Sequence, residues 1–206
     1  MTKNARNQAG LLAELAHAGY PVSSLDELRT SGCRYVEAVP ILLRELERET
    51  EPRTKEWIVR ALSVPWAKPA AIEPMLREFR DHPLGPDRLD GYRWAVGNAL
   101  WVLWDDKYFD EYMRLGADEQ FGRAREMLIL GFERSKRRAE ASEFLLGLLS
   151  DADVEGHAIS ALAKLAQSAA RPALEEASVH HPKTWVRNAA KRGVAKIDRL
   201  AEGKSR

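Results

Sequence analysis

A short phrase of small and apolar residues returns about every thirty residues along this chain, each time late in a segment with helical apolar spacing. The five copies are Ala61-Leu62, Ala99-Leu100, Gly131-Phe132, Ala161-Leu162 and Gly193-Val194. Their first residues are 38, 32, 30 and 32 positions apart. A fixed period in this range is typical of repeated helical hairpins, which stack because none can bury its apolar face alone. The sequence therefore predicts an all-α solenoid.

Apolar spacing and turn residues divide the chain into a cap, five hairpins and a tail. We expect an N-terminal helical cap over residues 1–32, repeats over 35–200 and a polar tail over 203–206. The expected first and second helices of the hairpins are 35–49 with 54–64, 69–80 with 91–104, 107–115 with 119–134, 139–149 with 154–166, and 169–179 with 183–200. The second hairpin carries a turn-rich insertion over 81–87. Because a repeat array has no internal boundary, we expect one domain over 1–206, folded as a right-handed α-α superhelix.

The composition excludes several classes of protein but does not identify a function. Lys and Arg total 32 against 31 Asp and Glu, so no global charge draws the chain to nucleic acid or membrane. Glu14 and His17 break the apolar run of the N-terminal segment, so we expect no signal peptide, and no apolar run is long enough to span a bilayer. Cys33 is the only cysteine and can form no internal disulfide. We expect a cytoplasmic monomer that does not bind membranes.

The repeats resemble a known family. A proline and a leucine near the start of the first helix, Val-Arg or its equivalent opening the second, and Ala-Leu closing it are similar to the short HEAT-like repeats first known from phycobilisome lyases. The best copies are 185–190 and 156–165, and the resemblance covers about 35–200. This repeat serves scaffolds, adaptors, lyases, glycosylases and hydroxylases, so the resemblance implies an architecture and no single activity. HEAT-repeat deoxyhypusine hydroxylases carry His-Glu iron ligands, and this chain has no His-Glu dipeptide.

One column of the aligned repeats is mostly cationic. It lies six positions before the recurring phrase and contains Lys55, Arg93, Arg125, Glu155 and Arg187. One interpretation is that each cation pairs with an acidic group of the adjacent repeat. The other is a ladder along a concave groove that binds an acidic peptide or a nucleic-acid backbone. Glu155 interrupts the row and weakens the second interpretation.

Aromatic residues gather around the second helix of the second hairpin. Trp94, Trp101 and Trp104 share a helical face, and apolar residues fill the other sides, which favours the buried middle of the array. The alternative is that a tryptophan reaches the groove beside Arg93 and forms a stacking site or a protein hot spot. HEAT-like alkylpurine DNA glycosylases use concave aromatics with a nearby acid, and Asp105-Asp106 follows Trp104. An aspartate pair is also typical of a helix end or a cap.

Basic residues gather in two further places. One is 134–138, and the other is the last helix with Lys183, Arg187, Lys191, Arg192, Lys196 and Arg199. A terminal repeat needs a polar outer face to end the stack in water, which explains such a stripe without a ligand. The alternative is a patch for an anionic partner.

These observations favour a non-enzymatic scaffold or adaptor that holds a protein or peptide segment in its concave groove. The candidate partner-binding residues are Lys55, Arg93, Trp94, Arg125 and Arg187. The chain offers no catalytic motif, no convergent metal ligands and no phosphate loop, so we expect no catalytic residue, metal or cofactor. The alternatives are a nucleic-acid-binding protein related to the glycosylases and a phycobilisome-lyase-like chromophore chaperone.

Overall fold

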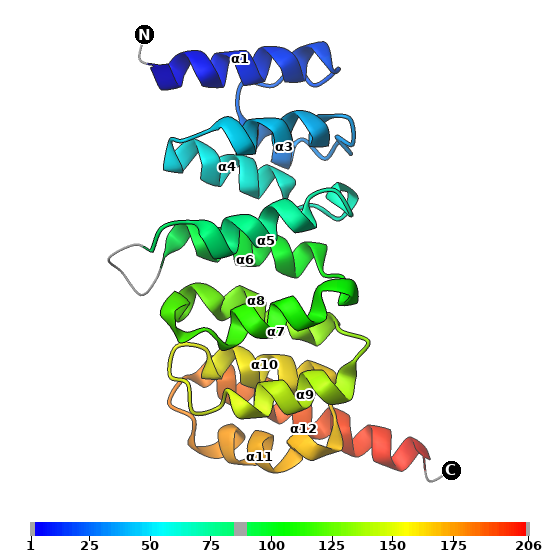
Figure 1. Cartoon of the computed structure of the whole chain (residues 1–206). Coiled ribbons are helices and arrows are strands. Elements are labelled where there is room, and N and C mark those ends of the chain that lie inside the picture. Colours follow the sequence, from blue (N-terminus) through cyan, green and yellow to red (C-terminus); the bar gives the residue numbers. More distant parts are fainter. Residues whose placement is uncertain (1–2, 85–89, 205–206) are drawn as a thin grey trace. The chain divides into compact units, whose positions relative to one another are not determined.

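The computed structural model describes residues 3–84 and 90–204, and every regular element within these ranges is a helix (Figure 1). The chain divides into two compact units, of which unit 1 comprises residues up to Pro83 together with Gly91–Leu103. Unit 2 comprises Leu84–Asp90 and residues from Trp104 onward. Part of the predicted insertion, residues 85–89, lies outside the described residues.

Unit 1 contains two helical hairpins and the predicted N-terminal helices. Its elements are α1 (Lys3–His17), α2 (Leu25–Thr30), α3 (Ala38–Arg48), α4 (Pro52–Leu62), the 3-10 helix η1 (Pro65–Ala67), α5 (Ile72–Asp81) and α6 (Gly91–Leu103). The first and second helices of each hairpin pack together, α3 on α4 and α5 on α6, and the second helices α4 and α6 also pack on each other. Helix α6 is buried at most of its positions, as its nearly continuous apolar sequence predicts.

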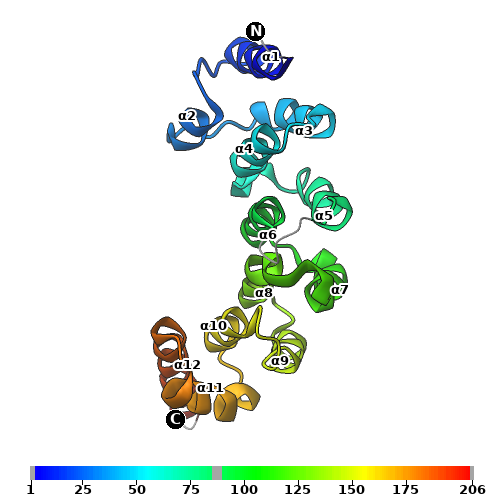
Figure 2. The same cartoon turned by 90° about the vertical axis from the view of Figure 1, so that its left-hand side faces the viewer.

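Unit 2 contains the remaining hairpins. Its elements are η2 (Asp106–Tyr108), α7 (Phe109–Ala117), η3 (Glu119–Arg125), α8 (Glu126–Gly131), η4 (Phe132–Arg134), α9 (Arg138–Gly147), α10 (Glu155–Leu165), η5 (Ser168–Ala170), α11 (Arg171–His180) and α12 (Thr184–Lys204). Helix α9 packs on α10 and α11 packs on α12, while the second helices α8, α10 and α12 pack in succession (Figures 1 and 2).

Local signals explain where the helices begin. The Glu51 carboxylate precedes α4 and accepts from the backbone N–H groups of Arg53 at 3.1 Å and Thr54 at 2.5 Å. Ser24 caps α2 in the same way through the N–H of Glu27 at 3.1 Å. Each cap satisfies N–H groups that the first helical turn leaves without a partner. Such caps depend only on neighbouring residues, which is why the sequence locates most helix ends to within a few residues.

One predicted helix is wrong. Residues 119–134 were expected to form one continuous helix, but the structure divides them into η3, α8 and η4. Gly122 has φ 50° and ψ −136°, a conformation that glycine adopts without the steric cost of a side chain. The chain therefore turns sharply at Gly122 before it enters α8.

The all-α prediction is confirmed over the described residues, and neighbouring helices pack as hairpins. The stacking of all hairpins into one superhelix stays a prediction. No helix in the described part of the chain is long and apolar enough to cross a membrane.

Candidate anion-binding groove between helices α10 and α12

The predicted ladder residue Arg93 is buried in unit 1. Its guanidinium has an exposed fraction of 0% and donates from Nε to the carbonyl oxygen of Phe79 at 2.7 Å. Its Nη2 donates to the carbonyl oxygen of His82. Both acceptors lie at the C-terminal end of α5, where helix carbonyls lack intrahelical donors. Arg93 therefore ties the end of α5 to α6.

Arg125 has the same kind of role in unit 2. Its side chain is fully buried and donates to the carbonyl oxygens of Gly122 at 2.9 Å and Gly116 at 3.0 Å. Its Nη2 lies 2.7 Å from Asp151 Oδ2 in the turn that precedes α10. Arg93 and Arg125 are therefore buried with their donors on internal acceptors, which favours internal pairing over an exposed ladder at these two positions.

The other members of the row are also paired. Lys55 Nζ lies 2.8 Å from Glu78 Oε2, and Tyr92 donates to the same oxygen at 2.7 Å. Arg187 Nη1 donates to the carbonyl oxygens of His181 at 2.7 Å and Pro182 at 2.9 Å. The interpretation that the cations pair with acids of the adjacent repeat is confirmed for Lys55 with Glu78 and for Arg125 with Asp151.

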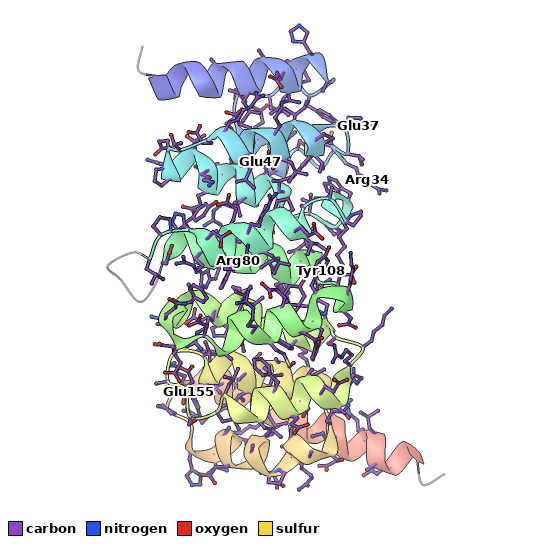
Figure 3. The ribbon with its side chains drawn as sticks, in the orientation of Figure 1. Arg34, Glu37, Glu47, Arg80, Tyr108 and Glu155 are labelled. Atoms are coloured by element: carbon purple, nitrogen blue, oxygen red, sulfur yellow. The ribbon has the colours of Figure 1, made fainter. Side chains whose placement is uncertain are left out.

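Glu155 is the one acidic residue of the row and lies at the start of α10 (Figure 3). Like Arg125, it contacts a residue in a turn of the next repeat. Its Oε1 lies 3.3 Å from His181 Nε2, in the turn before α12.

The last candidate partner-binding residue, Trp94, is half-buried on α6. Partner binding by Lys55, Trp94 and Arg187 stays a prediction.

Trp104, Asp105 and Asp106 take structural roles in unit 2. The Trp104 indole is 5% exposed and packs against the rings of Tyr112 and Phe132, at centroid distances of 4.4 and 4.9 Å. Its Nε1 donates to Asp106 Oδ1 at 2.9 Å. Asp105 accepts from the backbone N–H of Lys107 at 3.0 Å and caps η2. The three side chains do not form an open stacking surface with a free acid.

A different surface of unit 2 gathers exposed cations. A groove of about 570 Å³ lies between α10 and α12, which run side by side in Figures 1 and 2. It is lined by Ser160, Ala163, Lys164, Ala189, Arg192, Ala195, Lys196 and Arg199. Half of these residues are cationic, the others are small, and none is acidic. The groove therefore presents positive charge around a floor that a ligand backbone can approach closely.

Two of the four cations have partners that leave donors available. Lys196 Nζ donates to the carbonyl oxygen of Lys164 at 2.6 Å, which uses one of the three N–H groups of the ammonium. Arg199 Nε donates to the carbonyl oxygen of Ala195 at 3.3 Å. The side chains of Lys164 and Arg192 are exposed and have no hydrogen-bond or ion-pair partner among residues 3–84 and 90–204. Their charges are available to an anion.

Three cations of the groove, Arg192, Lys196 and Arg199, belong to the basic last helix of the sequence, and the fourth, Lys164, comes from α10. Ser160 and Arg192 lie one position before the recurring phrase, whereas Lys164 and Lys196 lie three positions after its first residue. Lys191, which belonged to the predicted outer stripe, lines a separate groove with residues of α11. The sequence signal that indicates this site is a lysine at the same position of two consecutive repeats, Lys164 and Lys196.

The equivalent face of unit 1 has another chemistry. A groove of about 400 Å³ there is lined by Arg29, Trp57, Arg60, Ser63, Val64, Asn98 and Val102. Arg60 donates to Glu56 Oε1 at 2.6 Å and Arg29 to Asp26 Oδ1 at 2.8 Å, so both charges are neutralised locally. Val64 and Val102 stand where unit 2 has Lys164 and Lys196.

The donor set of the α10–α12 groove suits anions. Arg and Lys bind carboxylates and phosphates through charge-assisted hydrogen bonds. No three His, Cys, Asp or Glu side chains within the described ranges gather where they could hold a metal ion.

Comparison with family models, with curated proteins and with solved structures finds no match to this chain.

Proposed function

We propose that this protein is a non-enzymatic interaction module that binds an acidic segment of a partner protein in the α10–α12 groove. The observation that carries the proposal is the set of four cations around a floor of small residues, with no acid among the lining side chains. Lys164 and Arg192 supply charge that no side chain in the described part of the chain neutralises, so an arriving carboxylate has no partner to displace there. Alanines such as Ala163 and Ala195 let the partner's backbone lie close to these cations.

The repeat architecture supports this proposal. The second helices pack in succession within each unit, α4 with α6 and α8 with α10 and α12, as HEAT-like repeats do. We propose that the hairpins belong to one HEAT-like array, whose inner helices offer grooves to extended partners. The exposed thiol of Cys33 suits a reducing compartment such as the cytoplasm.

A nucleic acid is the second candidate, because phosphates would also be attracted to this groove. The net charge of +1 gives no broad field that would extend such an interaction. Base-repair chemistry has less support, since Trp104, Asp105 and Asp106 are engaged in packing and capping. A role as a chromophore chaperone has only the resemblance of the repeats in its favour.

Fluorescence anisotropy with a labelled oligoglutamate peptide and a labelled oligo-dT, at low and at physiological salt, tests the proposal. We expect the peptide to bind and the double variant Lys164→Gln, Arg192→Gln to bind it about tenfold more weakly, a loss of about 1.4 kcal/mol. Lys191→Gln is the control for a charge lost outside the groove, because it removes one positive charge from α12 at a residue that lines a different groove. We expect it to bind like the wild type.

Two results would overturn the proposal. Equal peptide affinity for the double variant and the wild type would show that the groove is not the binding site. Tighter binding of oligo-dT than of the peptide, lost in the double variant and falling steeply with salt, would assign the groove to nucleic acid.

A further inference from the structure

An exposed tryptophan lies at the N-terminal end of the α10–α12 groove. Trp185 is 45% exposed, although it belongs to the first turn of α12, which packs on α10. Ala189 is the first α12 residue of the groove lining and follows Trp185 by one helical turn, as Ser160 follows Gly156 on α10. Residues four apart share a helical face. The Trp185 ring therefore continues the surface of the groove.

The ring of Trp185 reaches across to α10 and is held there by two residues. A Cβ added at Gly156 would lie 3.0 Å from Trp185 Cζ2 and Cη2, so a side chain at this position would compete with the ring for space. The ring also packs against the His157 imidazole, at a centroid distance of 5.4 Å. A side chain that is already fixed loses less conformational entropy when a ligand covers it.

The Trp185 indole also keeps its polar group available. Its Nε1–H has no hydrogen-bond partner among residues 3–84 and 90–204. An indole combines a large apolar surface with one N–H donor, and tryptophan and arginine are enriched among the residues that dominate protein interfaces. Trp185 can therefore contact an apolar side chain and donate to an oxygen of the same partner.

A short peptide can reach both the tryptophan and the cations. Arg192 lies seven residues after Trp185, a rise of about 10 Å along α12. An extended chain covers this length in about three residues. A single-stranded nucleic acid fits less well, because successive bases stack on several aromatic side chains and the lining of the groove contains none.

We propose that the acidic partner segment carries an aromatic residue within a few positions of its acids, and that Trp185 is the anchor that binds this residue. The partner's ring packs on the exposed surface of the Trp185 indole, while its carboxylates bind the cations of the α10–α12 groove. This inference rests on the proposed function. It adds Trp185 to the binding residues and an aromatic side chain to the requirements of the partner.

Two labelled peptides test the inference by fluorescence anisotropy. Both consist of glutamates around one central residue, which is phenylalanine in the first and alanine in the second. We expect the wild type to bind the phenylalanine peptide about tenfold more tightly, because only this peptide covers the Trp185 indole. Trp185→Ala should bind both peptides equally, with the affinity of the wild type for the alanine peptide. Val179→Ala is the control, because it removes exposed apolar surface from α11 and should change neither affinity.

The alanine peptide shows whether Trp185→Ala preserves the groove, since this peptide needs only the cations. Trp185→Leu, which keeps an apolar side chain beside Gly156, should also lower the preference for phenylalanine. A preference that persists in both variants would overturn the anchor at Trp185.

The outcomes separate this inference from the function on which it rests. Equal binding of the two peptides to the wild type, with both weakened by Lys164→Gln and Arg192→Gln, would overturn the aromatic anchor and leave the acidic-segment proposal standing. If neither peptide binds, or if oligo-dT binds more tightly than both, both proposals fail.

Discussion

The guanidinium of Arg125 lies 2.7 Å from the carboxylate of Asp151, across the boundary between two successive repeats of unit 2. The Arg125 side chain is 0% exposed and that of Asp151 is 14% exposed, so this is a largely buried ion pair. Arg125 also donates to two backbone carbonyl oxygens. One side chain thus joins the start of α8 to the turn before α10.

Replacing Arg125 with methionine should destabilise the protein by about 3–5 kcal/mol, because Asp151 loses its ion-pair partner and two buried carbonyl oxygens lose their donor. Urea unfolding would show a lower midpoint with an unchanged slope. Arg53→Met is the control, since Arg53 is exposed on α4 and its removal should cost no more than about 0.5 kcal/mol. Equal losses in the two variants would contradict a structural role for Arg125.

The contact of α12 with α10 depends on Gly193. A Cβ at this position would lie 2.7 Å from the Cα of Ala163, a backbone atom that cannot rotate away. Gly193→Ala should therefore cost about 1–3 kcal/mol and, by separating the two helices, weaken binding of oligoglutamate. Gly10→Ala is the control, because nothing lies within 4 Å of its added Cβ and alanine favours the helix by up to about 1 kcal/mol. A Gly193→Ala variant as stable as the wild type would contradict this close packing.

His157 should make stability fall as the pH is lowered. Burial lowers its pKa; the nearby cations Lys183 and Arg123 also lower it, while the Glu126 carboxylate raises it. The neutral imidazole is thus favoured in the folded state, and the unfolded chain takes up the proton first, below its pKa of about 6.5. Stability should decrease as the pH falls through this value toward the folded pKa.

Chemical unfolding at several pH values between about 7.5 and 5.5 would measure this dependence. His157→Gln should reduce the slope, because it removes the buried group whose pKa is lowered in the folded state. An unaltered slope in His157→Gln would assign the pH dependence to other groups.

Asp106 should matter for stability. Burial opposes its ionisation, but hydrogen bonds from the Trp104 indole, the Lys136 backbone and Ser135 outweigh this effect and lower its pKa. Asp106→Ala leaves the Trp104 and Lys136 donors without this acceptor and should cost about 1–3 kcal/mol, visible in urea unfolding followed by tryptophan fluorescence. Asp110→Ala, at an exposed ion pair, should cost at most about 1 kcal/mol. An Asp106→Ala variant as stable as the wild type would contradict this role.

The candidate site was harder to predict than the helices. The sequence places Lys55, Arg93 and Arg125 at one position of the repeat, and in the structure each has internal partners, Lys55 a carboxylate, Arg93 backbone carbonyls and Arg125 both. Whether a cation at this position faces a groove or binds groups in a neighbouring turn depends on the rotation of its helix about the helix axis. The sequence does not specify this rotation. Gly122 shows the same limit for the backbone, because a glycine in an apolar helical pattern does not reveal whether it takes a positive φ.

The all-α class, the hairpin period and most helix boundaries follow from apolar spacing, prolines and caps, which act within a few residues of the sequence. Which cations are buried and which are open depends on contacts between helices that are distant in the sequence. Arg125 meets Asp151 and loses its exposure, whereas Lys164 and Arg192 face the α10–α12 groove without a partner in the described chain. That difference arises from the packing of neighbouring helices, which brings together residues that local sequence patterns cannot relate.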